Sequence, residues 1–287
     1  MAKFKDEFHK SLKGIDGEEY VDTFFYRPLG FILAKLSSLT PITPNGISFL
    51  VFLTGLLTTY FFSRGTPSKI LLGGILLQIV NVLDCADGQL ARLKNRGNQL
   101  GRLIDGLVDY LVFFGIYLGI AIGLSKSTGN HWYWLVAILA GLSNALHSAL
   151  FDNYRQRFIA YTTGEVRKRQ DEYDVFSKKY STASNLFSRI LIGLYLRYTE
   201  FQQIFEREVW QESKDFAQIY SQKNRLLVRL WSFIGSSFHI VLVLIMAILE
   251  RIDLYLWLTA TVMNIYALVL YIVQWNHDRI FYMKRRK

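Results

Sequence analysis

Residues 84–92 read DCADGQLAR and residues 101–109 read GRLIDGLVD, which places four aspartates at fixed spacing within strongly apolar sequence. Ionisable side chains at membrane depth are costly, and by default they indicate a functional site. Four acids this close together would repel one another unless a cation joined them. The stretch therefore predicts a divalent-metal site inside a bundle of membrane helices.

The composition around this stretch is that of a membrane protein. Of the 287 residues, 51% are hydrophobic and 15% are aromatic, which is too apolar for an ordinary soluble domain. Segments near or above the roughly 20 apolar residues that cross a bilayer recur along the chain. We predict an all-α integral membrane fold with six spanning helices, over residues 47–63, 68–91, 103–124, 132–151, 231–249 and 254–275.

The basic residues predict how these helices are oriented. With six spans, residues 1–45, 92–102, 152–230 and 276–287 lie on one side and carry 29 of the 33 Lys and Arg residues, against 4 on the other side. Basic residues accumulate on the cytoplasmic side. Both termini and the acidic site are therefore expected to face the cytoplasm, in a plasma or inner membrane. Basic residues at membrane ends, rather than on one folded face, argue against nucleic-acid binding.

Four regions follow from this layout. Residues 1–46 form a cytoplasmic N-terminus with a helix in the membrane interface, since the apolar run after Phe24 is too short to span. Residues 47–155 hold the first four spans and the acidic motif at 84–109. Residues 156–230 form a cytoplasmic connection of interfacial helices, and residues 231–287 hold the last two spans and a basic tail.

Some intramembrane residues have packing as their simplest role. Gly115, Gly119 and Gly123 recur every four residues, which lets helices approach closely within the bundle or across a dimer. The single intramembrane histidines, His147 and His239, are expected to hydrogen-bond between helices. Cys85, the only cysteine, is expected to pack as a small apolar residue.

The four acids are expected to converge. Asp84 and Asp87 share one helix face, and Asp105 and Asp109 share another. The connection at 93–102 is short and polar, so the two helices should be antiparallel neighbours. At about 1.5 Å per residue, all four carboxylates then fall in one layer about 12–20 Å from the turn.

The ligand chemistry of this layer favours a hard cation and a phosphate. Carboxylate oxygens suit Mg²⁺, Mn²⁺ or Ca²⁺, whereas zinc would want His or Cys. Four carboxylates can hold two metals, the usual clamp for displacement at phosphorus. Gly88 and Gly101 expose the helix surface to a ligand, and Arg92 is suited to phosphate. Together these residues describe a site for a phosphoanhydride.

The motif resembles that of the CDP-alcohol phosphotransferase (CDP-alcohol phosphatidyltransferase) family, Asp-x2-Asp-Gly-x2-Ala-Arg-x8-Gly-x3-Asp-x3-Asp. Every position is filled, by Asp84, Asp87, Gly88, Ala91, Arg92, Gly101, Asp105 and Asp109. The six spans and the preceding interfacial helix are also similar to the family. The connection at 156–225 is longer than in its smallest members.

The resemblance implies a role for each motif residue. Asp84, Asp87 and Asp105 would ligate a first metal, Mg²⁺ or Mn²⁺, and Asp109 would lie near a second. Asp109 would also be the general base that deprotonates an alcohol. The CDP moiety would be bound by Asp84, Gly88, Ala91, Arg92 and Gly101. The family further implies a CDP-alcohol lipid donor, a small polar alcohol acceptor, CMP as product and a homodimer in the membrane.

Alternatives remain for the substrates, for the class of protein and for the role of two arginines. CDP-diacylglycerol as donor to a small polar alcohol is favoured, but CDP-choline or CDP-ethanolamine donating to diacylglycerol fits the same motif. The acids are also compatible with a cation transporter, with an inactive partner subunit, or with helix pairing neutralised by nearby arginines. Arg155 and Arg157 are either cytoplasmic anchors or ligands for a phosphate on the acceptor or lipid headgroup.

Overall fold

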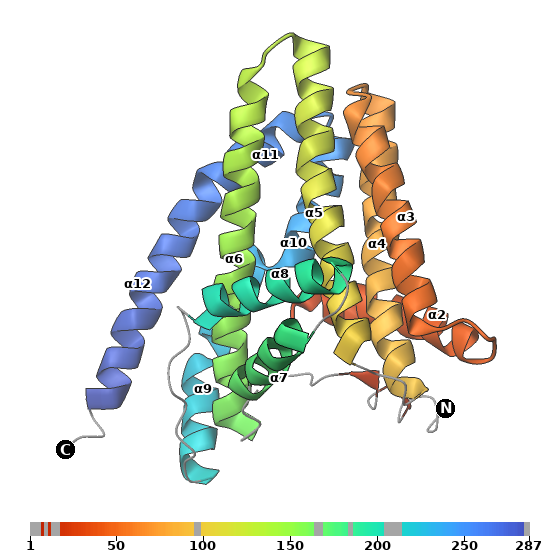
Figure 1. Cartoon of the computed structure of the whole chain (residues 1–287). Helices are drawn as coiled ribbons and strands as arrows, with labels where there is room; N and C mark the ends of the chain where they lie inside the picture. The colour runs from red at the N-terminus through yellow and green to blue at the C-terminus, as the bar shows by residue number, and fades with distance from the viewer. Residues whose placement is uncertain are drawn as a thin grey trace.

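The computed structural model describes residues 7–8, 11–12, 18–94, 99–163, 169–182, 186–203 and 214–283, and every regular element there is helical. The helices are η1 (Asp22–Tyr26), α2 (Arg27–Ser38), α3 (Pro44–Ser63), α4 (Pro67–Leu93), α5 (Gln99–Thr128), α6 (Trp132–Thr163), α7 (Arg169–Thr182), α8 (Leu186–Gln203), α9 (Lys214–Trp231), η2 (Ser232–Ile234), α10 (Ser236–Ile248), α11 (Ile252–Ala260) and α12 (Val262–Met283) (Figure 1). The predicted all-α membrane fold is confirmed. The basic tail at 284–287 and parts of the 156–230 connection lie outside the described residues.

Five helical stretches in the described residues are long and apolar enough to cross a membrane, and a bent pair makes up to six. The first four are α3, α4, most of α5, and α6. The last is Ile252–Arg279, which runs through α11 and α12. The bent pair, Ala217–Ile234 and Ser236–Ile248, turns by 45° where a straight fifth span was predicted. The bend falls at Gly235, whose backbone is extended with φ −71° and ψ 165°.

Sequence signals at the membrane ends explain where α3 and α4 begin. Both helices carry proline in the first turn, at Pro44 and Pro67, where the missing backbone N–H is not needed and φ is already helical. Thr43 caps α3 because its side-chain oxygen accepts a 3.1 Å hydrogen bond from the Gly46 N–H.

The glycine stripe of α5 is used inside the bundle. A Cβ added at Gly119 would lie 2.6 Å from the backbone oxygen of Thr59, and one at Gly123 would lie 2.1 Å from that of Phe62. On the other helix, a Cβ at Gly55 would lie 2.4 Å from a Val112 methyl group. The small residues therefore let α3 and α5 approach closely. The stripe therefore serves the contact between α3 and α5 within one chain. Packing within the bundle was one of the two roles predicted for it, and packing across a dimer was the other.

A buried hydrogen-bond chain ties the second half of the bundle together. His147 Nε2 lies 3.0 Å from Asn264 Oδ1, and His147 Nδ1 lies 3.3 Å from His239 Nε2. His239 Nδ1 is 3.4 Å from the Tyr255 hydroxyl, which is 2.7 Å from that of Tyr117. Because Asn264 Oδ1 can only accept, His147 must donate through Nε2, and His239 then donates to His147. The interhelical role expected for both histidines is confirmed.

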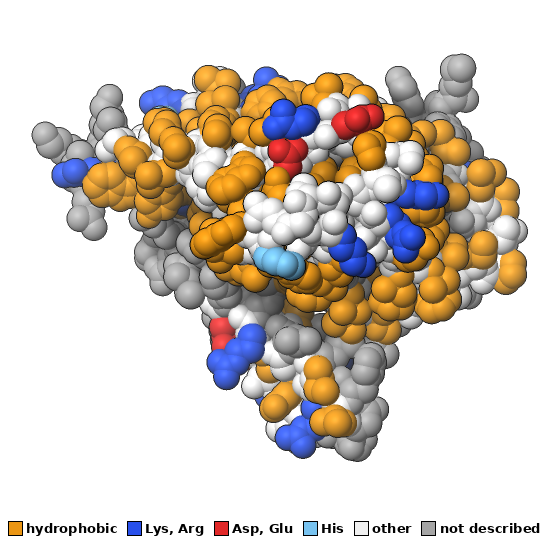
Figure 2. Space-filling view, turned by 90° about the horizontal axis from the view of Figure 1, so that it is seen from above, with side chains coloured by type: hydrophobic (Ala, Val, Ile, Leu, Met, Phe, Trp, Pro, Cys, Tyr) orange, Lys and Arg blue, Asp and Glu red, His pale blue; other side chains and the backbone are white. Residues whose placement is uncertain are grey.

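The outer surface of the bundle is apolar, as a lipid-facing surface must be. Exposed side chains along the spanning helices include Leu53, Leu56, Ile75, Leu142 and Ile265. Viewed from the end with the α3–α4 and α5–α6 connections, polar and charged groups are framed by hydrophobic ones (Figure 2).

Helices α2 and α8 lie toward the other end of the bundle (Figure 1). Helix α2 crosses there and packs against α4, with Phe31 buried and Leu36 exposed. Helix α8 lies across α5, where buried Ile192 packs in one cluster with Leu107. Leu107 sits between two of the motif aspartates, so α8 covers α5 next to the acidic site.

Candidate metal and nucleotide site

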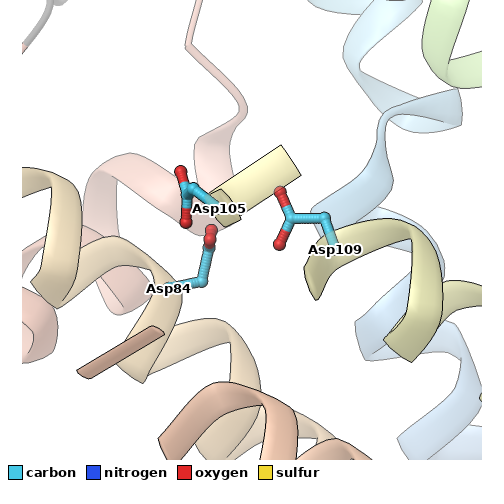
Figure 3. A group of neighbouring side chains, drawn as sticks. All are labelled: Asp84, Asp105 and Asp109. Carbon is cyan, nitrogen blue, oxygen red and sulfur yellow. The ribbon is translucent and has the colours of Figure 1, made fainter. Parts of the chain in front are cut away.

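Three of the four motif aspartates come together. One carboxylate oxygen from each of Asp84, Asp105 and Asp109 lies within 4.8 Å of the others, and the carboxylates point toward a common centre (Figure 3). Asp84 comes from α4 and the other two from α5. Asp84 and Asp105 are half-buried, whereas Asp109 is exposed. The cluster is therefore built between two helices, with one acid at its open side.

Helix α3 is the element that holds α4 and α5 in this relation. The most extensive helix contacts in the described residues are those that α3 makes with α5 and with α4. The sequence predicted that α4 and α5 would be antiparallel neighbours. The most extensive contacts of each helix are with α3. The acids bridge the space between α4 and α5. Among the residues that the structure describes, none comes within 4 Å of a Cβ built at Gly106, beside Asp105.

The fourth acid, Asp87, is held by α3. It is 4% exposed, and its Oδ2 accepts a 2.7 Å hydrogen bond from the Ser48 hydroxyl. Asp84 lies nearly one turn earlier on α4, and the charges of Asp84 and Asp105 act on Asp87. Asp87 therefore lies beside the three-acid cluster, and one of its carboxylate oxygens is hydrogen-bonded to Ser48 of α3.

The nucleotide-binding candidates lie near the α4–α5 connection, with Gly88, Ala91 and Arg92 on α4 and Gly101 on α5. The Arg92 guanidinium lies over Gly88, where a Cβ would come 3.6 Å and 3.7 Å from its two terminal nitrogens. Arg92 Nε donates to the backbone oxygen of Ser11, so the N-terminal segment fixes the arginine. Ala91 and Gly101 are both half-buried. Gly88 therefore lets the Arg92 guanidinium lie close to the α4 backbone.

The cluster fits a divalent metal. Its three ligands are carboxylate oxygens whose mutual distances are short enough for one ion. Hard cations such as Mg²⁺ prefer such ligands and usually keep water or substrate oxygens in their remaining positions. Asp84, Asp105 and Asp109 would hold the ion, and Asp87 is close enough to orient or join this set.

The N-terminal segment contributes a second polar group that the sequence did not reveal. Glu18 accepts hydrogen bonds from Arg27 at 3.1 Å and 3.3 Å and also from Arg155 of α6. Next to it, buried Glu19 accepts the backbone N–H groups of Ser237 and Phe238, at 3.2 Å and 2.9 Å. Glu19 thereby caps α10 at the break in the bent pair. Burial, together with the charge of Asp22, raises the pKa of Glu19 to about 8.

The two arginines singled out after the fourth span have separate partners. Arg155 binds Glu18, whereas buried Arg157 donates to Asp278 of α12 at 3.0 Å and packs over the Tyr154 ring. Asp278 also accepts a 2.9 Å hydrogen bond from Gln274. Arg157 therefore joins α6 to α12 in a buried network, and Arg155 alone lies with the N-terminal acids.

The sequence carried little sign of the residues that support the site. Ser48, Ser11 and Glu18 are 36, 73 and 66 residues before Asp84, and no spacing rule relates such distant positions. The one indication was that Ser48 is polar in an apolar span.

A protein-family model described as CDP-alcohol phosphatidyltransferase matches residues 41–205, more than half of the chain. The match runs from the start of the first span to the end of α8 and contains all four aspartates. No curated protein matches the chain.

Proposed function

Because this chain belongs to the CDP-alcohol phosphatidyltransferase family, we propose that it moves a phosphatidyl group from CDP-diacylglycerol to a hydroxyl of a small polar alcohol. The family implies transfer from a CDP-alcohol to an alcohol at a membrane. The observation that carries the proposal is the convergence of Asp84, Asp105 and Asp109 on one centre.

The reaction is a displacement at phosphorus. The acceptor hydroxyl oxygen would attack the phosphorus remote from cytidine, the anhydride P–O bond would break, and CMP would leave. Two bound Mg²⁺ ions, or Mn²⁺ ions in their place, would neutralise the negative charge of the pyrophosphate and of the leaving CMP. The residues that would hold these ions are Asp84, Asp87, Asp105 and Asp109.

Asp109 is our candidate for the general base. A base must come within hydrogen-bond reach of the hydroxyl that it deprotonates, and Asp109 is the exposed member of the cluster. Gly88 and Arg92 would receive the donor phosphates, with Ala91 and Gly101 beside the nucleotide. A substrate next to Asp105 would meet none of the described residues within 4 Å of a Cβ built at Gly106.

The membrane context follows from the same layout. We propose that both termini and the acidic site face the cytoplasm, because the motif lies toward the basic α4–α5 connection. We also propose that the protein is a homodimer in the membrane. The second candidate chemistry, transfer from CDP-choline or CDP-ethanolamine to diacylglycerol, shares the acid cluster and differs only in which substrate carries the lipid.

The test is CMP release by purified protein with Mg²⁺ and CDP-diacylglycerol across a panel of polar alcohols. Release with one alcohol, lost on chelation of the metal, is the expected result. Release only with CDP-choline or CDP-ethanolamine plus diacylglycerol would favour the second candidate. Failure to release CMP under either condition, with no binding of CMP, would overturn the proposal in favour of a transporter or an inactive subunit.

A further inference from the structure

Two arginines from distant parts of the chain share one carboxylate. Arg27 lies in the first turn of α2 and Arg155 lies in α6, yet both donate to Glu18. The Arg27 and Arg155 side chains are each 17% exposed, and the Glu18 side chain is 7% exposed. This is a partly buried triad with two positive charges and one negative charge, so each ion pair is weakly screened by solvent.

The triad adjoins the acid cluster through α2 and α4. A Cβ at Gly30 would lie 2.8 Å from the Cβ of Cys85, the residue after Asp84. The Gln89 amide donates to the backbone oxygen of Arg27 at 3.2 Å. The charge of Arg27 acts on Asp84. Arg27 is therefore close enough to the acid cluster for its charge to be felt at Asp84.

Each arginine has a buried hydrogen-bond donor that Glu18 does not satisfy. The Nε atoms of Arg27 and Arg155 are buried and have no acceptor among the residues that the structure describes. A buried N–H without an acceptor costs free energy comparable to its lost hydration. Glu18 already balances part of the charge, so a neutral oxygen, such as a hydroxyl, suits these two donors.

A phosphate group would meet a different environment. Glu18 and Asp22 both lie at the arginines. A phosphate dianion would have to displace Glu18 from both arginines before it gained their charge. Like charges placed together in a partly buried site cost several kcal/mol, which is about the scale of a substrate preference.

We propose that Glu18 neutralises an arginine pair in the acceptor subsite and so makes the enzyme select an alcohol that carries hydroxyl groups but no phosphate. The inference rests on the proposed transfer reaction. It replaces, for Arg155, the role of phosphate ligand that the sequence suggested.

The direct test is binding of inorganic phosphate to the purified full-length protein, measured by calorimetry. Wild type should bind weakly, and Glu18→Gln should bind at least about tenfold more tightly, because the arginine pair regains its charge. Adding Arg155→Gln to that variant should abolish the gain. Glu7→Gln is the matched control, since it removes a carboxylate paired with Lys35 on the same α2 helix. Equal phosphate affinity in wild type and Glu18→Gln would overturn the proposal.

A second measurement needs no variant. Wild type is assayed with an alcohol and its own phosphomonoester, for example inositol and inositol phosphate, or glycerol and glycerol phosphate. The unphosphorylated member of a pair should give the higher kcat/KM, and a clear preference for the phosphomonoester would refute the role of Glu18. If neither gives CMP, the transfer reaction itself is in doubt, whereas phosphate binding still decides the role of Glu18.

Discussion

The Ser48 hydroxyl of α3 donates a 2.7 Å hydrogen bond to Asp87 Oδ2 of α4. This bond joins α3, the helix that organises the bundle, to the acid beside the three-acid cluster. Asp87 is 4% exposed and Ser48 is equally buried, so water cannot easily replace the hydroxyl.

Ser48→Ala should therefore raise the Mg²⁺ concentration that the enzyme requires. Loss of a group that orients a metal-binding carboxylate typically costs about 10–100-fold in metal affinity or activity. We expect the Mg²⁺ concentration for half-maximal CMP release to rise by a factor in that range. Ser63→Ala, at the far end of the same helix, is the control and should leave it unchanged. An unaltered Mg²⁺ requirement in Ser48→Ala would mean that Asp87 does not support the metal.

Asp109→Asn should separate binding from turnover. The amide cannot accept the proton of the attacking hydroxyl, so turnover should fall by at least about 100-fold. CDP-alcohol binding should persist, because Asp84, Gly88 and Arg92 are untouched. CMP release and CMP binding are measured on the same preparation. A variant that retains most of its turnover would remove Asp109 from the role of base.

Asp84→Asn should weaken metal binding. Asp84 is the only contribution of α4 to the three-acid cluster, so its loss leaves ligands from one helix only. We expect weaker Mg²⁺ and CMP binding together, measured by calorimetry with each ligand alone and in combination. Unchanged Mg²⁺ binding would exclude Asp84 as a ligand.

Two matched glycine substitutions test the packing of α3 on α5. Gly119→Ala places a Cβ 2.6 Å from the Thr59 backbone oxygen, and backbone cannot move aside cheaply. Overpacking of this kind costs about 1–3 kcal/mol, so the unfolding temperature should fall. Gly106→Ala, on the same helix, meets none of the described residues within 4 Å and should hold or raise that temperature. Equal behaviour of the two variants would show that the contact is looser than described.

Local spacing was enough to predict the acid cluster. The i, i+3 and i, i+4 positions put the aspartates on shared faces of α4 and α5, and hydropathy located most spans to within a few residues. The sequence could not show that α3 would mediate the pairing of α4 and α5. That outcome depends on close contacts at Gly55 and Gly119, which become specific only when both helices are present.

The bend before α10 was hidden for a related reason. Residues 231–249 have the composition of an ordinary span, so periodicity predicts a straight helix. The structure satisfies the N–H groups at the break with Glu19, more than 200 residues away in sequence. A helix end inside a bundle needs such a cap, and the accepting side chain can come from any part of the chain.

Glu19 also makes stability depend on pH. Its pKa rises from 4.5 to about 8 because burial and, to a lesser extent, the charge of Asp22 disfavour the ionised form, while the two N–H bonds to α10 only partly compensate. Between these two values the folded protein holds a proton that the unfolded chain has lost. Stability should therefore fall as pH rises from about 5 to 8. The pKa of Asp22 is raised in the same direction, so Glu19→Gln should flatten this slope without removing it.

The readout is the unfolding temperature of purified wild type, Glu19→Gln and Glu200→Gln between about pH 5 and pH 9. Gln keeps a carbonyl for one N–H of α10 and loses the second bond, so the variant is expected to be less stable overall. The slope, rather than the absolute temperature, therefore carries the information. Glu200→Gln removes an acid from an exposed ion pair on α8 and should keep the wild-type slope. A wild-type slope in Glu19→Gln would place the pH dependence in another group.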